Sequence, residues 1–350
     1  MSLKNKKFII LLLTLCLFSF LLVNCANKET NPKSPLSKSN YLLGTLVTIS
    51  LYDSQDNKII DEAFDRIRDI ENRMSINSEE PSQITHLNEA SGSHSVELSE
   101  DTFQVLERGL YYSKLTDGRF DITIGPIVKL WNIGTEHAAI PDSDILSEKL
   151  KLVDYNNLSL NKDRLTAKLE MEGMIVDLGG IAKGYAADEV ASILKKNGVK
   201  HAIINLGGNI LVIGSNINGS PWKIGIQDPY DSRNDYMGIV EVVDKSVVTS
   251  GIYERYFEAD GKRYHHILDP ETGFPADNGL AAVSIITNKS IDADGLSTSA
   301  FLLGLDKGRE LIENTEDTEA IFITTDKNIY LTSGIKNKFI LINKEYKLMD

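Results

Sequence analysis

Hydrophobic and polar positions along the chain alternate with two different periods, which predicts a mixture of strands and helices. Residues 44–51 alternate with a period of two, as a half-buried strand does. A helical spacing of three and four residues follows at Ile60, Phe64, Ile67, Ile70 and Met74. Asp and Ser are common N-cap residues, so we expect Asp53 or Ser54 to cap the start of this helix.

The rest of the body continues the same mixture of elements. We expect a helix from Ser99 to the Asp117-Gly118 turn, and another around Ala186 that ends at Asn197-Gly198. The other expected elements are strands at residues 174–178, 201–206, 320–324 and 339–342, a hairpin of residues 252–259 and 262–268 around Asp260-Gly261, and helices at residues 296–303 and 307–314. With no internal repeat and no second linker, this pattern predicts one α+β or mixed α/β domain over residues 41–350, with its topology left open.

The N-terminus has the pattern of an export signal rather than of a folded element. Residues 1–24 contain three lysines near the start and then an apolar run, which is typical of a signal peptide. Cys25 follows in a sequence that resembles a bacterial lipobox, so we expect it to be lipidated. An uncleaved anchor is the alternative, but the apolar run is shorter than the roughly 20 residues of a spanning helix. Residues 25–40 are mostly polar, and we expect them to form a disordered tether.

Composition excludes several classes of function. The 350 residues have a net charge of -13, which disfavours a nucleic-acid partner because such proteins present a basic face to phosphates. The two cysteines are Cys16 and Cys25, so the body after the tether can form neither an internal disulfide nor a thiolate metal site. The fold must therefore depend on packing alone.

A glycine-rich turn at residues 177–185 is the first candidate for chemistry. Gly179 and Gly180 allow backbone amides to approach an anion at a helix start, and Lys183 would add positive charge. The segment matches neither the Walker loop nor the dinucleotide fingerprint. A plain strand-to-helix turn with a solvated lysine is the alternative.

Two further segments carry polar side chains suited to a metal or a base. Asp294 and Thr298 are one helical turn apart, so a carboxylate and a hydroxyl share a face and offer the hard oxygen ligands that Mg²⁺ prefers. A simple helix cap at Asp294 is the alternative. His265 and His266 are adjacent in an expected strand, so one of them faces inward. A histidine there can be a general base, a metal ligand or a hydrogen-bonded core residue.

Taken in order, these segments resemble the FAD:protein FMN transferase family (ApbE). The matching motifs are Leu-Gly-Thr at 43–45, Met-Ser at 74–75, Asp-Gly-Arg-Phe-Asp-Ile-Thr at 117–123, Leu-Trp at 130–131, residues 177–186, Gly-Gly-Asn at 207–209, residues 222–226, Thr-Ser-Gly at 249–251, residues 266–273 and residues 293–298. The resemblance implies a single domain of antiparallel or mixed sheets with packed helices. It also implies an exported, lipid-anchored enzyme on the periplasmic side of the bacterial cell membrane, which binds FAD with Mg²⁺ and attaches FMN to a Thr or Ser hydroxyl of a partner flavoprotein.

The resemblance also implies roles for individual residues. The FAD pyrophosphate would lie over the glycine-rich turn near Lys183, and Mg²⁺ would be held by Asp294, Thr298 and the carbonyl of Gly180. His266 would take the proton from the acceptor hydroxyl, as a neutral imidazole can near pH 7. The other positions implied to contact FAD are Leu43, Asn77, Arg119, Phe120, Asp121, Asp177 and Ile267.

Two positions depart from the family pattern. Leu43 stands where many members have Met, which is a conservative apolar exchange. Asn77 stands where many transferases have an aromatic ring that would stack on the flavin, and in the family Asn is associated with members that also hydrolyse FAD. A Mg²⁺-dependent FAD pyrophosphatase giving FMN and AMP is therefore one alternative function. A flavin-binding lipoprotein without catalytic activity is another.

Overall fold

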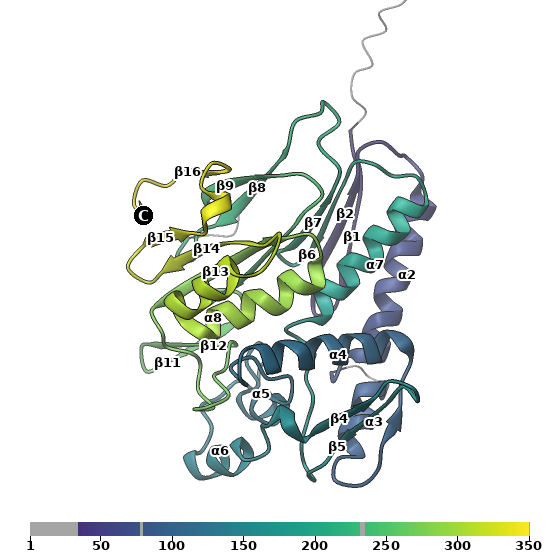
Figure 1. The fold of residues 1–350 in the computed structure, drawn as a ribbon, viewed down its shortest axis with the longest axis vertical. Coiled ribbons are helices and arrows are strands. Elements are labelled where there is room, and N and C mark those ends of the chain that lie inside the picture. The colour runs from purple at the N-terminus through teal and green to yellow at the C-terminus, as the bar shows by residue number, and fades with distance from the viewer. Residues whose placement is uncertain (1–33, 78–79, 232–234, 350) are drawn as a thin grey trace, which may run out of the picture. The chain divides into compact units, whose positions relative to one another are not determined.

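A nine-stranded sheet forms the centre of the computed structural model (Figure 1). Neighbouring strands are antiparallel except at one edge, where β15 and β17 run parallel. In spatial order the strands are β1 (Leu36–Leu42), β2 (Thr45–Leu51), β6 (Ala202–Leu206), β7 (Asn209–Ile213), β10 (Ser246–Gly251), β13 (Leu280–Thr287), β14 (Glu319–Thr324), β15 (Asn328–Leu331) and β17 (Lys347–Leu348). This mostly antiparallel sheet with packed helices confirms the expected α+β class.

The structure describes residues 34–77, 80–231 and 235–349. The expected signal peptide, Cys25 and residues 25–33 of the expected tether lie outside this range. Within it, no helix is long and apolar enough to cross a membrane.

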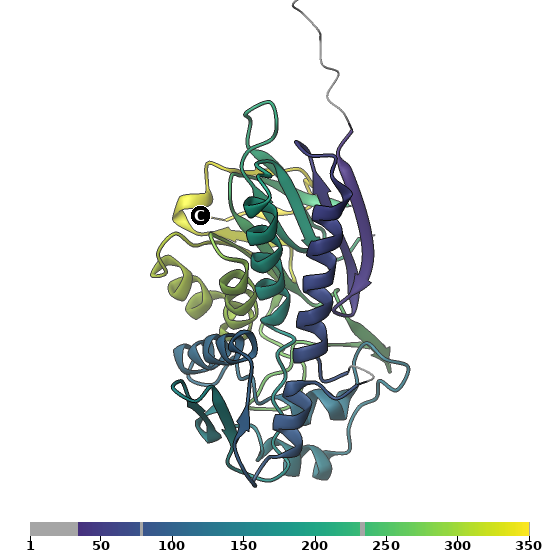
Figure 2. The same cartoon turned by 90° about the vertical axis from the view of Figure 1, so that its right-hand side faces the viewer.

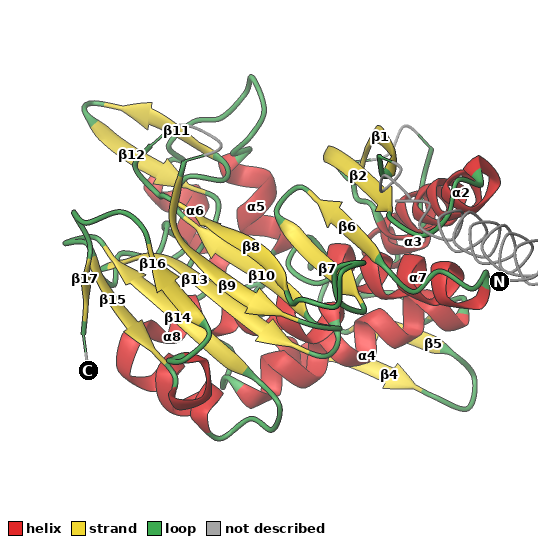
Figure 3. Ribbon diagram, turned by 90° about the horizontal axis from the view of Figure 1, so that it is seen from above, coloured by secondary structure: helices red, strands yellow, loops and turns green. Residues whose placement is uncertain are grey.

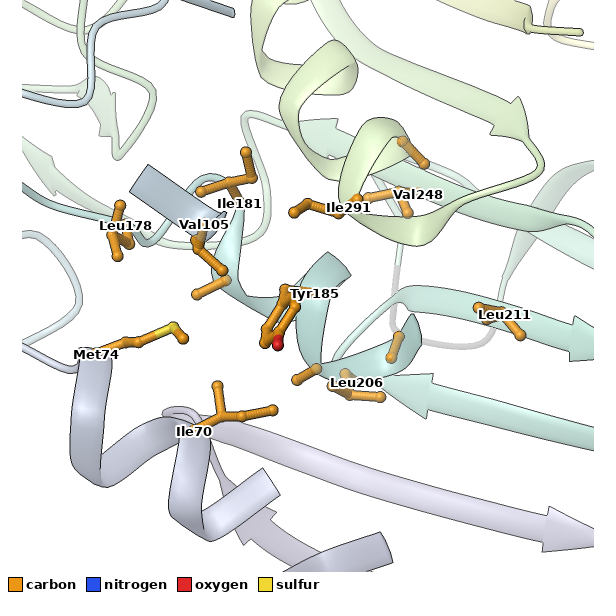
Figure 4. Packing of buried hydrophobic residues seen from close by; sticks show 14 of the residues in the cluster. Ile70, Met74, Val105, Leu178, Ile181, Tyr185, Leu206, Leu211, Val248 and Ile291 are labelled. Carbon is orange, nitrogen blue, oxygen red and sulfur yellow. The ribbon is translucent and has the colours of Figure 1, made fainter. Parts of the chain in front are cut away.

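Helices cover one face of the central sheet. α2 (Asn57–Met74) and α7 (Ala182–Lys196) run side by side (Figure 2), and α8 (Ser290–Glu313) packs next to α7. Ile70 of α2, Leu178 before α7 and Tyr185 of α7 belong to one buried apolar cluster, part of which Figure 4 shows. The large apolar core on this face holds the start of α7 and the first half of α8 in place.

A smaller sheet covers part of the opposite face (Figure 3). It consists of β8 (Trp222–Gln227), β9 (Tyr236–Val242) and β16 (Phe339–Leu341), whose apolar side chains pack on the central strands. Because both faces are covered, every residue of β13 is buried. The remaining elements are α3 (Gln83–Glu89), β3 (Val96–Glu97), α4 (Glu100–Leu115), α5 (Gly125–Trp131), α6 (Ser143–Leu150), β4 (Leu158–Asn161), β5 (Thr166–Leu169), the hairpin β11 (Tyr256–Ala259) and β12 (Lys262–His265), and the short 3₁₀ turns η1 (Tyr155–Asn157) and η2 (Ser333–Ile335).

Most of the expected elements are confirmed, and their ends follow local signals. Ser99 caps α4 by accepting from the Thr102 backbone N–H. Asp260 and Gly261 both have positive φ at the tip of the β11–β12 hairpin, as a tight turn of this kind requires. The two helices expected at residues 296–303 and 307–314 are parts of α8, separated by Gly304, whose φ of 77° is non-helical.

Three expectations about elements need correction. Helix α2 is capped by Asp56, not by Asp53 or Ser54. Residues 174–178 form no strand, because their one bridge joins Ile175 to Ile124. Met174, Val176 and Leu178 are buried without belonging to a strand. The folded unit also begins before residue 41, since β1 includes residues 36–40, which the sequence assigned to the tether.

The sequence did not reveal strand β1, because its side chains make polar contacts across to β2 and α2 instead of burying an apolar face. Ser37 donates to the Ser50 hydroxyl at 2.7 Å, and Ser39 pairs with the Thr48 hydroxyl at 2.8 Å. Lys38 forms an ion pair with Asp61 of α2 at 2.6 Å. A polar sequence can therefore form an edge strand here that composition alone does not reveal.

Candidate active site

The first turn of α7 meets the first turns of α8 at a buried carboxylate. Asp294 is 3% exposed, and its Oδ2 accepts from the backbone N–H of Gly184 at 2.9 Å. The Lys183 ammonium lies 3.5 Å from Asp294 Oδ1 and donates to the carbonyl of Gly179 at 3.1 Å. Gly184 has no room for a side chain, because an added Cβ would lie 2.2 Å from the Ser290 carbonyl oxygen. This close approach of two helices brings the glycine-rich turn to Asp294.

Thr298 lies one turn further along α8, next to Gly180. A Cβ placed on Gly180 would come within 3.8 Å of Thr298 Oγ1 and 3.1 Å of the Phe120 ring. Asp294, Thr298 and Gly180 therefore lie on two facing segments. Their carboxylate, hydroxyl and carbonyl oxygens are a donor set that suits Mg²⁺.

This donor set contains only one carboxylate. In the described part of the chain, no group of three or more His, Cys, Asp or Glu side chains is arranged to hold a metal ion. A Mg²⁺ ion at Asp294 would therefore need substrate phosphate and water to complete its six ligands, as is common for this ion. The residues present fit such a substrate-assisted site.

The two adjacent histidines have different environments. His265 is 7% exposed, its Nε2 donates to the carbonyl of Ala276 at 3.0 Å, and its Nδ1 accepts from the Ile267 N–H at 3.3 Å. Burial lowers the pKa of His265 to about 4. His265 is thus the inward-facing, hydrogen-bonded core residue of the pair.

His266 is partly exposed and is held in the tautomer that a base requires. Its Nδ1 lies 3.3 Å from the carbonyl of Arg255, which can only accept, so Nδ1 carries the hydrogen and Nε2 keeps a free lone pair. Burial, assisted by the positive charges of Arg255 and Lys183, lowers the pKa of His266 to about 3. The ring is therefore neutral at pH 7 and able to accept a proton at Nε2.

Asp177 lies near three positively charged side chains. Its Oδ1 accepts from the Gly179 N–H at 2.7 Å, which shapes the glycine-rich turn. Burial raises the pKa of the Asp177 carboxyl, while that hydrogen bond and the charges of Lys129, Arg255 and Lys183 oppose the change. These charges offset part of the protein's negative field where an anionic ligand would bind.

The segments around Leu43 and Asn77 border this region. Leu43 adopts a positive φ of 53°, and its N–H donates to Glu71 at 2.8 Å. The following residue, Gly44, accepts at its carbonyl from the Arg255 guanidinium at 3.4 Å. The exposed Asn77 side chain accepts from the Lys129 ammonium at 3.1 Å, so this position carries a polar pair.

The other implied FAD contacts have strong partners within the protein. Arg119 pairs with Asp269 at 3.4 Å and Glu271 at 2.7 Å, which joins its segment to the one that follows His266. Asp121 is 6% exposed and accepts hydrogen bonds from Thr123 and from the Tyr155 N–H. Phe120 and Ile267 are buried. The structure places these residues in the framework around the glycine-rich turn and His266, and their contact with FAD stays a prediction.

The sequence assigned no role to three residues of this region: Lys129, Ser250 and Arg255. Arg255 supplies the carbonyl that fixes His266 and a guanidinium near Gly44, whereas Lys129 reaches Asn77 from α5. Ser250 of β10 contacts the Thr298 hydroxyl at 3.1 Å. Their roles depend on contacts between distant segments. The available signals were the Thr-Ser-Gly motif for Ser250 and the Tyr-Glu-Arg segment beside a tight hairpin for Arg255.

Comparison with known proteins identifies the family. A model described as the ApbE family matches residues 43–322. The chain belongs to the ApbE family. A relative from Klebsiella pneumoniae is 38% identical over 90% of this chain and 97% of its own length, and one from Treponema pallidum is 35% identical over 89% and 91%. Both relatives carry the name FAD:protein FMN transferase.

Solved structures of ApbE proteins have the same fold. The ApbE protein of Thermotoga maritima superposes with a TM-score of 0.80 at 30% identity and covers 87% of this chain and 99% of its own. The flavin transferase ApbE of Vibrio cholerae superposes with a TM-score of 0.78 at 27% identity, with the same coverage. The expected ApbE fold and family are thus confirmed.

Proposed function

We propose that this transferase of the ApbE family moves FMN from FAD onto a Thr or Ser hydroxyl of a partner flavoprotein, with Mg²⁺ and with release of AMP. The observation that carries the proposal is the meeting of Asp294 and Thr298 on α8 with the glycine-rich turn and Lys183 at the start of α7. Oxygen ligands for a cation and the Lys183 ammonium, which can bind phosphate, converge there. The neutral His266 is close enough for the charge of Lys183 to affect its pKa. The names of the relatives point to the same reaction.

The reaction is a displacement at the phosphorus of the FMN half of FAD. Nε2 of His266 accepts the proton of the acceptor hydroxyl, and the hydroxyl oxygen forms a bond to phosphorus. The bond from phosphorus to the bridging oxygen breaks, and AMP leaves with that oxygen. The products are an FMN phosphoester on the acceptor and AMP.

The remaining contribution of the chain is to bind and neutralise the pyrophosphate. The Lys183 ammonium at the start of α7 would face its oxygens. Asp294, Thr298 and the Gly180 carbonyl would hold Mg²⁺, which offsets the negative charge that develops on the leaving and transferring groups. In a chain with a net charge of -13, such local positive charge is needed for an anionic dinucleotide to bind.

In-gel flavin fluorescence tests this function. The purified protein is incubated with FAD, Mg²⁺ and a Thr-bearing flavoprotein acceptor, and the acceptor is then denatured and separated. Fluorescence that stays with the denatured acceptor, and that requires Mg²⁺, is the expected result. An acceptor that stays dark while the enzyme is folded and binds FAD would overturn the proposal.

A second candidate function is FAD hydrolysis to FMN and AMP. The observation that favours it is Asn77, whose side chain is exposed and bound to Lys129 instead of offering an aromatic ring to the flavin. The open position would admit water beside the pyrophosphate. An Asn77→Tyr variant is expected to release less AMP without an acceptor, and unchanged release would exclude this role for Asn77.

A flavin-binding lipoprotein without catalysis is the third candidate. It predicts that wild type and Asp294→Ala both release no AMP from FAD, with or without the acceptor. The transferase instead predicts turnover in the wild type that Asp294→Ala lowers by at least 100-fold, because the variant removes a carboxylate ligand of the cation.

We also propose that the enzyme acts outside the cytoplasmic membrane, tethered by a lipid on Cys25. The support is the signal-like pattern of residues 1–24 and the lipobox-like position of Cys25. One acyl chain binds a membrane only reversibly, so a diacylated or triacylated N-terminus is expected.

A further inference from the structure

Ser250 of β10 contacts two hydroxyl groups of α8 at once. Its Oγ lies 2.8 Å from Ser297 Oγ and 3.1 Å from Thr298 Oγ1. Ser297 Oγ in turn lies 2.9 Å from the backbone carbonyl oxygen of Asp294. Four oxygen atoms therefore form a chain that begins at Thr298 and ends at a carbonyl.

The direction of every hydrogen bond in this chain follows from its end. A carbonyl oxygen only accepts, so Ser297 must donate to Asp294. Each hydroxyl has one hydrogen, so Ser250 must donate to Ser297, and Thr298 must then donate to Ser250. The hydrogen of Thr298 thus points toward the sheet, and both lone pairs of its oxygen remain for another partner.

This polarity is what a cation ligand requires, because a metal ion binds the lone pairs of a hydroxyl and is repelled by its hydrogen. Ser297 is fully buried, so water does not compete for the middle of the chain. The chain also ties Thr298 to the Asp294 backbone through Ser250, so the two expected ligands share one support. We propose that Ser250 is a positioning residue that orients the Thr298 hydroxyl as an electron-pair donor to Mg²⁺.

This inference rests on the proposed Mg²⁺ site and adds a residue that is not one of its three expected ligands. Removing a residue that hydrogen-bonds to a metal ligand commonly lowers metal affinity by about 10- to 100-fold. The same range is expected for Ser250→Ala. Ser250→Thr keeps the hydroxyl and is expected to stay within about threefold of wild type.

Direct binding of Mn²⁺, used as a paramagnetic probe for Mg²⁺, tests the inference without relying on turnover. Free Mn²⁺ is measured by electron paramagnetic resonance as the full protein is titrated, with FAD present. Ser284→Ala is the matched control, because it removes the partner of Thr249 in a similar hydroxyl pair, 2.7 Å apart, between β10 and β13. Its Mn²⁺ affinity is expected to equal that of wild type.

Equal Mn²⁺ affinity of wild type and Ser250→Ala would overturn the inference while leaving the metal site intact. Absence of Mn²⁺ binding by the wild type would instead overturn the site and the proposed function together. If Ser250→Ala does not fold, Ser297→Ala provides the second test. There Ser250 is free to donate to Thr298 and to reverse its polarity, so weaker Mn²⁺ binding is expected, and unchanged binding would contradict the inference.

Discussion

At the scale of single residues, the two adjacent histidines show how environment separates similar side chains. His265 is fixed between Ala276 and Ile267 inside the core, whereas His266 keeps a free Nε2 and is partly exposed. The sequence predicted that one histidine faces inward but could not say which tautomer the other adopts. That property depends on the carbonyl of Arg255, which lies in the bend just before β11.

His266→Gln is expected to lower kcat for flavin transfer by about 10²- to 10⁴-fold, the usual contribution of a general base. FAD affinity should stay within a few fold, because the variant retains a polar side chain of similar size. Transfer kinetics and FAD binding by fluorescence quenching measure the two effects. A wild-type transfer rate in His266→Gln would exclude His266 as the general base.

The pH dependence of transfer gives a related expectation. Because the pKa of His266 is lowered to about 3, the ring stays neutral well below pH 6.5. The rate at pH 5.5 should therefore exceed half of the rate at pH 7.5. An acid limb centred near pH 6.5 would show that this histidine titrates as an ordinary exposed one.

His265 predicts a pH dependence of stability. Its pKa is about 4 in the folded chain and 6.5 ordinarily, so between these values the unfolded chain binds more protons. Stability should rise with pH from about 4 to 6.5, and be lost as pH falls through that window, with about 3 kcal/mol from this residue at most. Urea denaturation of wild type and His265→Gln at several pH values measures this contribution. If the free energy of unfolding changes equally with pH in both proteins, His265 does not contribute in this way.

At the scale of elements, the position of α7 against α8 determines the candidate site. Lys183 and Gly184 reach Asp294 because the two helices approach at Gly184, where no Cβ fits. Gly184→Ala is expected to lower the free energy of unfolding by about 1–3 kcal/mol, because the colliding atom belongs to the backbone of Ser290. Urea denaturation measures this effect.

The variant Lys196→Ala is the control for Gly184→Ala, since it lies on the exposed side of the same helix. A change within about 0.5 kcal/mol is expected for it. Equal unfolding free energies for Gly184→Ala and the control would show that the helices can separate at no cost.

Elements with local signals were predictable, and those that depend on distant partners were not. The cap at Ser99, the Asp260-Gly261 turn and the break near Gly304 all follow from their own residues. Residues 174–178 have the apolar pattern of a strand, but their backbone pairs with the neighbouring segment only through the bridge of Ile175 to Ile124 and the hydrogen bond from the Asp177 N–H to the Ile122 carbonyl. Strand β1 is polar and forms because β2 supplies partners for its backbone and hydroxyls.

The same distinction holds for the site. Asp294 and Thr298 share a helix face, which a spacing of four residues predicts directly. Their link to Ser250, and that of His266 to Arg255, join segments whose proximity comes from the folded sheet. The resemblance to the ApbE family supplied the meeting of the glycine-rich turn with α8, which spacing alone left open.

At the scale of the whole molecule, an acidic enzyme is expected to work at a membrane surface. Cys25→Ser should remove the lipid and move the protein from the membrane fraction to the soluble fraction. Metabolic labelling with palmitate and cell fractionation measure this, while flavin transfer in vitro should be unchanged. Membrane association that survives the variant would favour an uncleaved anchor over a lipid.

The proposed reaction transfers FMN to a hydroxyl of an acceptor protein. Mass spectrometry of the acceptor after incubation with the enzyme, FAD and Mg²⁺ tests this most directly. One FMN phosphoester on a Thr or Ser side chain for each AMP released is the expected result. Free FMN and AMP formed beside an unmodified acceptor would contradict it and identify the protein as a hydrolase.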